Sequence, residues 1–158
     1  METIEFSRWK VDCDSEATRA AYALIRQGAP EVCGCLHCRN FVAARSQVYG
    51  PQVLALFDRL GVNSEREAEV YHNARVAPAL HSYGGWFHVV GTLVSGADGK
   101  QRVADDVWTF DYQPAAPRFS LGFTVDSQLV PGPFKELNLV QLEFSAEVPW
   151  VLDDPDTE

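Results

Sequence analysis

Apolar residues in the first part of the chain recur with a period close to 3.6 residues, the spacing of one face of an α-helix. The first such stretch follows a potential cap at Asp14 or Ser15 and precedes Gly28. The last begins after Gly50 and stops at Gly61, a residue that favours the left-handed end of a helix. The apolar positions of the three predicted helices span residues 17–25, 41–48 and 53–60.

After Gly61 the period changes to two, which is typical of β-strands. Residues 139–148 alternate most regularly, as expected for a sheet with one dry face and one solvated face. The alternation in residues 3–11 slips once, which predicts a strand with a β-bulge. The predicted strands span residues 3–11, 68–72, 86–94, 107–112, 119–125 and 139–148.

Helices first and strands afterwards indicate an α+β fold rather than alternating β-α-β units. Short connections such as residues 95–100 favour antiparallel neighbours. We therefore expect N-terminal helices packed on a mostly antiparallel, strongly twisted or partly closed β-sheet of about five or six strands. The chain shows no internal repeat or linker, so we expect one domain over residues 1–152 and an acidic, frayed tail over residues 153–158.

Acidic residues outnumber basic ones along this chain. Its 158 residues include 22 Asp and Glu against 13 Lys and Arg, for a formal net charge of -9. This charge argues against nucleic acid or an anionic membrane surface as the partner. It suits a basic protein partner, as in an immunity-type protein that masks a basic toxin or nuclease surface.

The N-terminus carries no recognisable export signal. Glu2 and Glu5 stand where a secretory signal needs positive charge, and no apolar region follows. The longest largely apolar run, residues 86–94, is less than half of the roughly 20 residues that a membrane helix needs. We therefore expect a soluble, cytoplasmic protein whose cysteines are reduced thiols.

Three of the four cysteines lie in the segment Cys33-Gly34-Cys35-Leu36-His37-Cys38, directly before a predicted helix. A Cys-x-x-Cys turn lets two thiolates converge on one zinc ion, and Gly34 allows Cys33 to join them. The spacing therefore predicts a structural zinc site in which Cys33, Cys35 and Cys38 tie this loop to the rest of the fold.

A closed tetrahedral zinc site needs a fourth ligand, which must come from elsewhere in the chain. Cys13 would make the site all-thiolate, and His72, His81 and His88 are the alternatives. His37 lies inside the short loop, and we expect it to point away from the ion.

Two other interpretations of the cysteines remain open. Free cysteine often packs as a small buried hydrophobe without chemistry. Alternatively, Cys35 at a helix N-terminus is a nucleophilic thiolate in a thiol-disulfide redox protein, with Cys38 as the resolving thiol.

Trp86 and His88 share one face of the predicted strand 86–94 and are candidates for a binding cleft. His88 is equally explained as a histidine whose ring is satisfied by neighbours in the sheet. The aromatic stripe Trp108, Phe110 and Tyr112 is typical of a core. No pattern of known catalytic motifs is present, so we assign no catalytic residue and favour a role other than catalysis.

Three segments together resemble an uncharacterised family of small bacterial proteins. They are Cys-x-Cys-x-x-Cys-Arg-Asn-Phe at 33–41, Gly-Gly-Trp-Phe-His at 84–88, and Gln-Leu-Glu-Phe-Ser-Ala-Glu-Val-Pro-Trp at 141–150. The resemblance covers most of the chain. It implies a bacterial, single-domain protein and adds no mechanism, because that family has no established activity.

Overall fold

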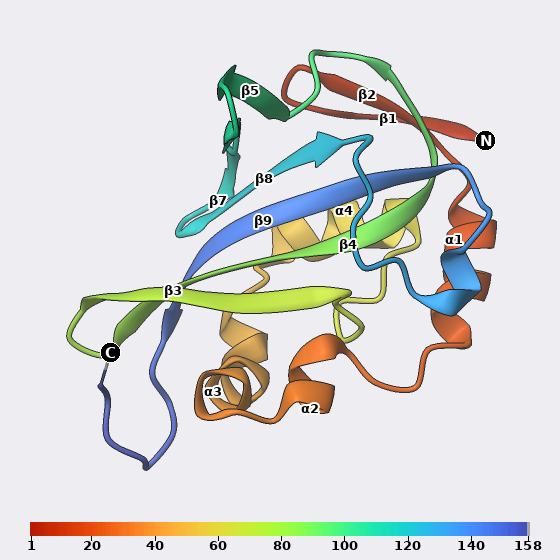
Figure 1. Cartoon of the computed structure of the whole chain (residues 1–158). Coiled ribbons are helices and arrows are strands. Elements are labelled where there is room, and N and C mark those ends of the chain that lie inside the picture. The colour runs from red at the N-terminus through yellow and green to blue at the C-terminus, as the bar shows by residue number, and fades with distance from the viewer. Residues whose placement is uncertain (158) are drawn as a thin grey trace.

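A seven-stranded antiparallel sheet forms the centre of the computed structural model, which describes residues 1–157, and helices pack behind and below it (Figure 1). The strand order is β1-β2-β4-β9-β8-β7, with β3 also paired to β4, and β5 and β6 form a separate hairpin. This confirms the predicted α+β class. The strands are β1 (Glu2–Phe6), β2 (Trp9–Cys13), β3 (Glu69–Ala77), β4 (Leu80–Ser95), β5 (Lys100–Ala104), β6 (Val107–Phe110), β7 (Gln113–Ala116), β8 (Phe119–Thr124) and β9 (Leu139–Pro149). The helices are α1 (Ser15–Ala23), α2 (Ala29–Cys33), α3 (Leu36–Ala44) and α4 (Pro51–Leu60), with short 3-10 turns η1 (Arg45–Gln47) and η2 (Gly132–Phe134).

The main sheet has more strands than the five or six expected, for two local reasons. The slip within residues 3–11 is a tight turn between β1 and β2, with Ser7 at a φ of 52°, rather than a bulge inside one strand. The short strand β7 pairs with β8 and has no clear alternation in its four residues, Gln113–Ala116.

Trp108 lies on the separate β5–β6 hairpin and is exposed. For this residue, the prediction that the aromatic stripe lies in the core is wrong.

The long strand β4 organises the sheet. One edge of β4 pairs with β3 and then with β2, and the other edge pairs with β9 along most of its length. Gly85 is needed where β3 approaches, because a Cβ there would lie 2.3 Å from the Glu69 carbonyl oxygen and 2.7 Å from the Phe144 ring.

The predicted dry face of β9 is confirmed. Phe144 lies among four aromatic rings: Phe41 of α3, Tyr49 just before α4, Phe87 of β4 and Phe119 of β8. Burying each ring contributes on the order of 2–3 kcal/mol to the stability of the fold. This aromatic cluster therefore holds the helices against the sheet. The buried apolar side chains of β9 are Val140, Leu142, Phe144, Ala146 and Val148.

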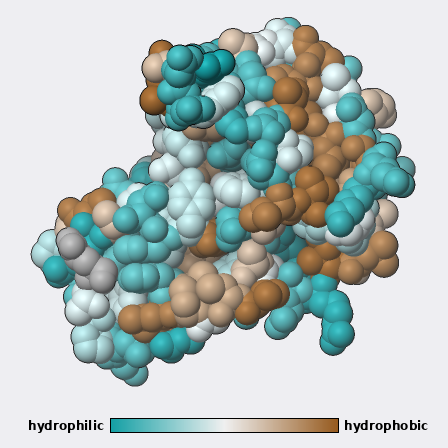
Figure 2. Space-filling model, in the orientation of Figure 1, coloured by the Kyte–Doolittle hydropathy of each residue, from teal (hydrophilic) through white to brown (hydrophobic). Residues whose placement is uncertain are grey.

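The opposite face of β9 is less solvated than its polar residues predict. The connection between β8 and β9 crosses in front of the sheet (Figure 1), and hydrophobic atoms gather over this region of the surface (Figure 2). Beneath it, Gln141 is buried, and its Oε1 accepts a hydrogen bond from the Gln128 N–H at 2.7 Å. The loop that precedes β9 in the sequence therefore covers part of the face that the alternation predicts to be solvated.

The tail expected to be frayed contacts the fold. Arg75 Nε donates to Asp156 at 3.2 Å, and the Ala79 N–H donates to the same carboxylate at 2.7 Å. Arg39 forms an ion pair with Asp154 at 3.5 Å. None of the helices in residues 1–157 combines the length and the hydrophobicity that spanning a bilayer requires.

Candidate metal centre

The three clustered cysteines occupy the corner between α2 and α3. Gly34 ends α2 in the left-handed region at a φ of 65°, which turns the chain back at once. Cys35 is then the N-cap of α3, and its Sγ accepts a hydrogen bond from the Cys38 N–H at 3.5 Å. The predicted helix of residues 41–48 therefore begins earlier, at Leu36, and Cys38 lies in its first turn.

This corner brings three sulfur atoms together. The Sγ atoms of Cys33, Cys35 and Cys38 all lie within 4.8 Å of one another. In a tetrahedral zinc site with Zn–S bonds of about 2.3 Å, neighbouring sulfurs are about 3.8 Å apart, so small side-chain rotations suffice. Cys33 and Cys35 are exposed and Cys38 is buried, so these residues could hold a metal ion at the molecular surface.

The surroundings of Cys35 and Cys38 shift the pKa values of their thiols in opposite directions. Burial acts to raise the pKa of Cys35, but hydrogen bonds from the Cys38 N–H and from the neighbouring thiols lower it below its ordinary value. Burial raises the pKa of Cys38, and the adjacent Cys35 and Cys33 sulfurs raise it further. Without metal, therefore, Cys35 gives up its proton before Cys38 does.

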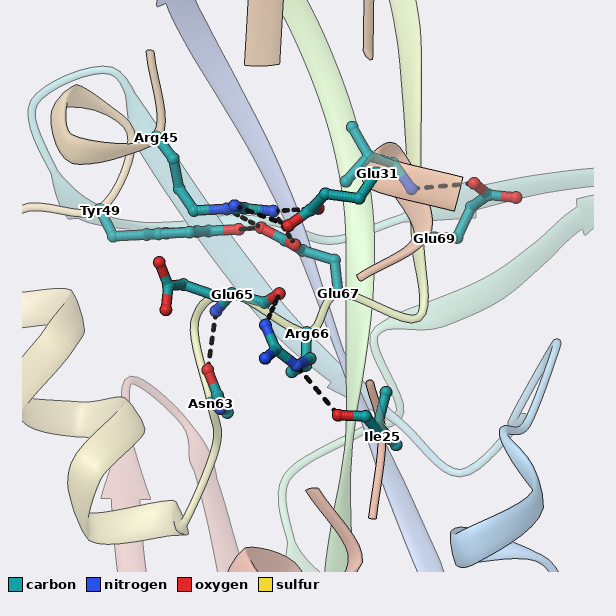
Figure 3. Close-up of polar contacts among 10 residues, drawn as sticks. Ile25, Glu31, Arg45, Tyr49, Asn63, Glu65, Arg66, Glu67 and Glu69 are labelled. Carbon is teal, nitrogen blue, oxygen red and sulfur yellow. Dashed lines mark hydrogen bonds and ion pairs between the residues drawn. The ribbon is translucent and has the colours of Figure 1, made fainter. Parts of the chain in front are cut away.

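A buried ion network fixes the helix that carries Cys33 (Figure 3). Arg45 Nη2 donates to Glu31 of α2 at 2.7 Å and to Glu67 at 2.8 Å, and the Tyr49 hydroxyl donates to Glu67 at 2.7 Å. The Ala29 N–H at the start of α2 donates to the Glu67 carbonyl oxygen at 2.9 Å. A helix of five residues is too short to be stable alone, so these contacts hold it beside α3.

The structure does not bring Cys13 to the other cysteines. Cys13 lies on β2 in the core, where its thiol donates to the Leu60 carbonyl oxygen at 3.3 Å. Burial raises its pKa to about 11, which disfavours the thiolate that a metal needs. Cys13 behaves in this structure as a buried hydrophobe with one hydrogen bond.

His88 and Trp86 lie apart from the sulfur atoms as well. His88 is buried on β4, with Nε2 hydrogen-bonded to Gln141 Oε1 at 3.0 Å, and burial lowers its pKa. Trp86 Nε1 donates to the Gln128 carbonyl oxygen at 3.0 Å. Trp86 also lines a surface cavity of about 300 Å³ with Tyr71, Trp108, Tyr112 and Glu143, among others.

The remaining histidines form a second group. One ring nitrogen each of His37, His72 and His81 lies within 4.8 Å of the others, outside the group of sulfur atoms. Burial lowers the pKa of His37 and of His72, and the neighbouring histidines lower both further. In the sequence, His72 and His81 are separate alternatives for the fourth zinc ligand. The turn at Pro78 and Ala79, which joins β3 to β4, is the signal that places them near each other.

No protein-family model, curated protein or solved structure matches the chain. The resemblance to a family of small bacterial proteins therefore stays a prediction.

Proposed function

We propose that this protein is a soluble, cytoplasmic bacterial metal-binding protein in which Cys33, Cys35 and Cys38 hold a structural zinc ion. The convergence of the three Sγ atoms within 4.8 Å at the corner between α2 and α3 carries this proposal. All four cysteines are free thiols, which suits a reducing compartment.

The ion would act as a cross-link. Cys33 is the last residue of α2, whereas Cys38 is buried in the first turn of α3. One zinc bound to both would join a five-residue helix to the hydrophobic core. Among residues 1–157 the sulfur group has three members, so it lacks the fourth protein ligand of the closed site that the sequence predicts. We propose that an external ligand such as water takes the fourth position on the exposed side.

Elemental analysis of protein purified without chelator tests this site. We expect the zinc content to fall by about one ion per chain from the wild type to a Cys35→Ser, Cys38→Ser double variant. Cys13→Ser is the matched control, because it removes a thiol outside the group and keeps a donor toward Leu60. Wild-type thiols that react freely while no zinc is bound to them would contradict the proposal.

A second candidate, thiol-disulfide exchange, is favoured by the exposed position of Cys35 at the N-cap of α3. The Cys35 thiolate would attack a substrate disulfide, forming a mixed disulfide and releasing one thiolate. Cys38, after losing its proton, would attack Cys35 and release the second thiolate. The protein dithiol is oxidised and the substrate disulfide reduced by two electrons.

The rate of alkylation against pH separates the two functions. A redox role predicts fast alkylation of Cys35 below the ordinary cysteine pKa of about 8.5 and a trapped mixed disulfide in Cys38→Ser. A zinc role predicts that alkylation becomes fast only after a chelator is added.

A further inference from the structure

Three histidine rings from separate segments pack together beside the C-terminal tail. The His37 ring, from α3, stacks on the His72 ring of β3 with centroids 3.7 Å apart and planes inclined by 2°. His72 Nε2 lies 2.8 Å from Nδ1 of His81 on β4. Stacked and hydrogen-bonded imidazoles place several nitrogen lone pairs in one small volume.

The buried His81 is oriented by a carboxylate. Its Nε2 makes a hydrogen bond with Asp156, which Arg75 and the Ala79 N–H hold in place. Since a carboxylate can only accept, the proton of neutral His81 lies on Nε2 and the Nδ1 lone pair faces His72. Histidines that bind metals in proteins are commonly oriented in this way, by a carboxylate on the nitrogen remote from the ion.

His37 supplies an independent observation. Its Nε2 is buried and has no hydrogen-bond partner among residues 1–157. The backbone next to this ring is fixed, because the Tyr83 hydroxyl donates to the His37 carbonyl oxygen at 2.7 Å. A buried nitrogen without a partner costs free energy, and a cation bound to its lone pair would remove that cost.

We propose that His37, His72 and His81 form a second metal site, separate from the cysteines, that binds a divalent transition metal, with zinc as the ion we assign. Asp156 would be the outer carboxylate that orients His81. Three imidazoles suit zinc and its first-row neighbours and are poor ligands for magnesium or calcium.

The rings would have to move to admit the ion. Imidazole lone pairs lie in the ring plane, so the parallel His37 and His72 rings, with centroids 3.7 Å apart, would tilt until their nitrogens converge on it. With Zn–N bonds of about 2.0–2.1 Å, tetrahedral ligand nitrogens are about 3.3 Å apart. The His72–His81 pair, at 2.8 Å, would open slightly, and His72 would move its proton from Nε2 to Nδ1. Three protein ligands leave a fourth position for water or a small anion.

Trp150 covers one side of the group, since its ring centroid lies 4.9 Å from that of His81 and 6.0 Å from that of His37. His81 is fully buried, whereas His37 and His72 are partly exposed. The ion would therefore be reached from solvent along the His37 and His72 rings.

Metal binding in a Cys33→Ser, Cys35→Ser, Cys38→Ser variant tests the proposal separately from the cysteine site. We expect this variant to bind one zinc per chain, and to bind Co²⁺ with visible d–d absorption but no thiolate-to-metal charge-transfer band. Adding His72→Gln and His81→Gln should abolish this binding. His88→Gln, the one histidine outside the group, should leave it unchanged.

Asp156→Asn provides a test that leaves the ligands and the core intact. In the cysteine-free background we expect zinc affinity, measured by competition with a chromophoric chelator, to fall about 10–100-fold with an unchanged far-ultraviolet circular dichroism spectrum.

Failure of the cysteine-free variant to bind zinc or Co²⁺ while it remains folded would overturn the proposal and leave the thiolate site untouched. One zinc in the wild type, lost equally in the cysteine and histidine variants, would also overturn it, because a single shared site would then explain both groups. Zinc in the cysteine-free variant but none at the wild-type thiols would contradict only the structural cysteine site.

Discussion

At the scale of single residues, position in the fold changes the chemistry of identical side chains. Cys13 and Cys38 are both buried, yet only Cys38 lies with other sulfur atoms. His88 and His81 lie seven residues apart on β4, but His88 faces Gln141 and Phe134, whereas His81 faces another histidine and Asp156. Residue type alone therefore does not assign a role to either thiol or imidazole in this chain.

His88 should make stability depend on pH. Its pKa is lowered by burial, so the folded protein binds fewer protons than the unfolded chain just below pH 6.5. Its contribution is therefore complete above about pH 6.5 and is lost as pH falls toward its folded-state pKa. The polar groups around His88 are the Tyr22 hydroxyl, the Gln128 backbone and Gln141, with Glu143 behind Gln141.

Urea unfolding of wild type and His88→Gln at pH 7.5 and 5.5, both with chelator, measures this effect. We expect the wild type to lose more stability than the variant over this pH range, by no more than about 1.4 kcal/mol per pH unit for one proton. Contributions from the other ionisable groups are common to both proteins and cancel in the difference. Equal losses of unfolding free energy in the wild type and in His88→Gln would show that His88 does not cause the pH dependence.

At the scale of elements, the short helix α2 depends on its neighbours. It spans five residues and ends at a left-handed glycine. Two contacts anchor α2. The Glu31 carboxylate accepts from the Arg45 guanidinium, and the Ala29 N–H donates to the Glu67 carbonyl oxygen. The Glu67 side chain is fully buried, so its charge depends on Arg45 and the Tyr49 hydroxyl. The position of Cys33 is therefore set by an ion network that lies outside the cysteine segment.

Arg45→Leu should destabilise the protein by about 3–5 kcal/mol, because it leaves the buried Glu67 carboxylate without its cation. Arg59→Ala is the matched control: its ion pair with Glu2 is exposed and 3.4 Å long, so its loss should cost less than about 1 kcal/mol. Urea unfolding measures both values. Equal, small effects would mean that the network does not hold this region.

At the scale of the whole molecule, the two candidate sites differ in how far apart their residues lie in the sequence, because the three cysteines fall within one six-residue segment and the histidines do not. The histidine group joins α3, β3 and β4, and the tail adds Asp156. The net charge of -9 is a property of the entire chain, and the basic protein partner that it suggests stays a prediction.

Removing metal should lower the melting temperature. If zinc is present at about 100 times its dissociation constant, it adds about 2.7 kcal/mol per site, or about 5–10 °C for a chain of this size. Differential scanning calorimetry with zinc and with excess chelator measures the shift. The shift should be smaller in Cys33→Ser, Cys35→Ser, Cys38→Ser, and identical melting of the wild type in both buffers would contradict any structural metal.

Local sequence signals determined the elements. The Asp14 cap, the Gly61 stop and the alternation in residues 139–148 act through neighbouring residues, and the structure confirms each of them. The Cys33, Cys35 and Cys38 cluster is equally local, because one turn at Gly34 assembles it. Such features could be read from the sequence because only a few successive residues decide them.

Tertiary structure alone decided the rest. The packing of α3 beside the local β3–β4 hairpin and the return of the tail bring His37 and Asp156 to His72 and His81 across more than a hundred residues. The same long-range packing keeps Cys13 out of the sulfur group and buries His88 beneath the connection between β8 and β9. These outcomes depend on how distant elements share one core, and no local pattern of polar and apolar residues encodes that choice.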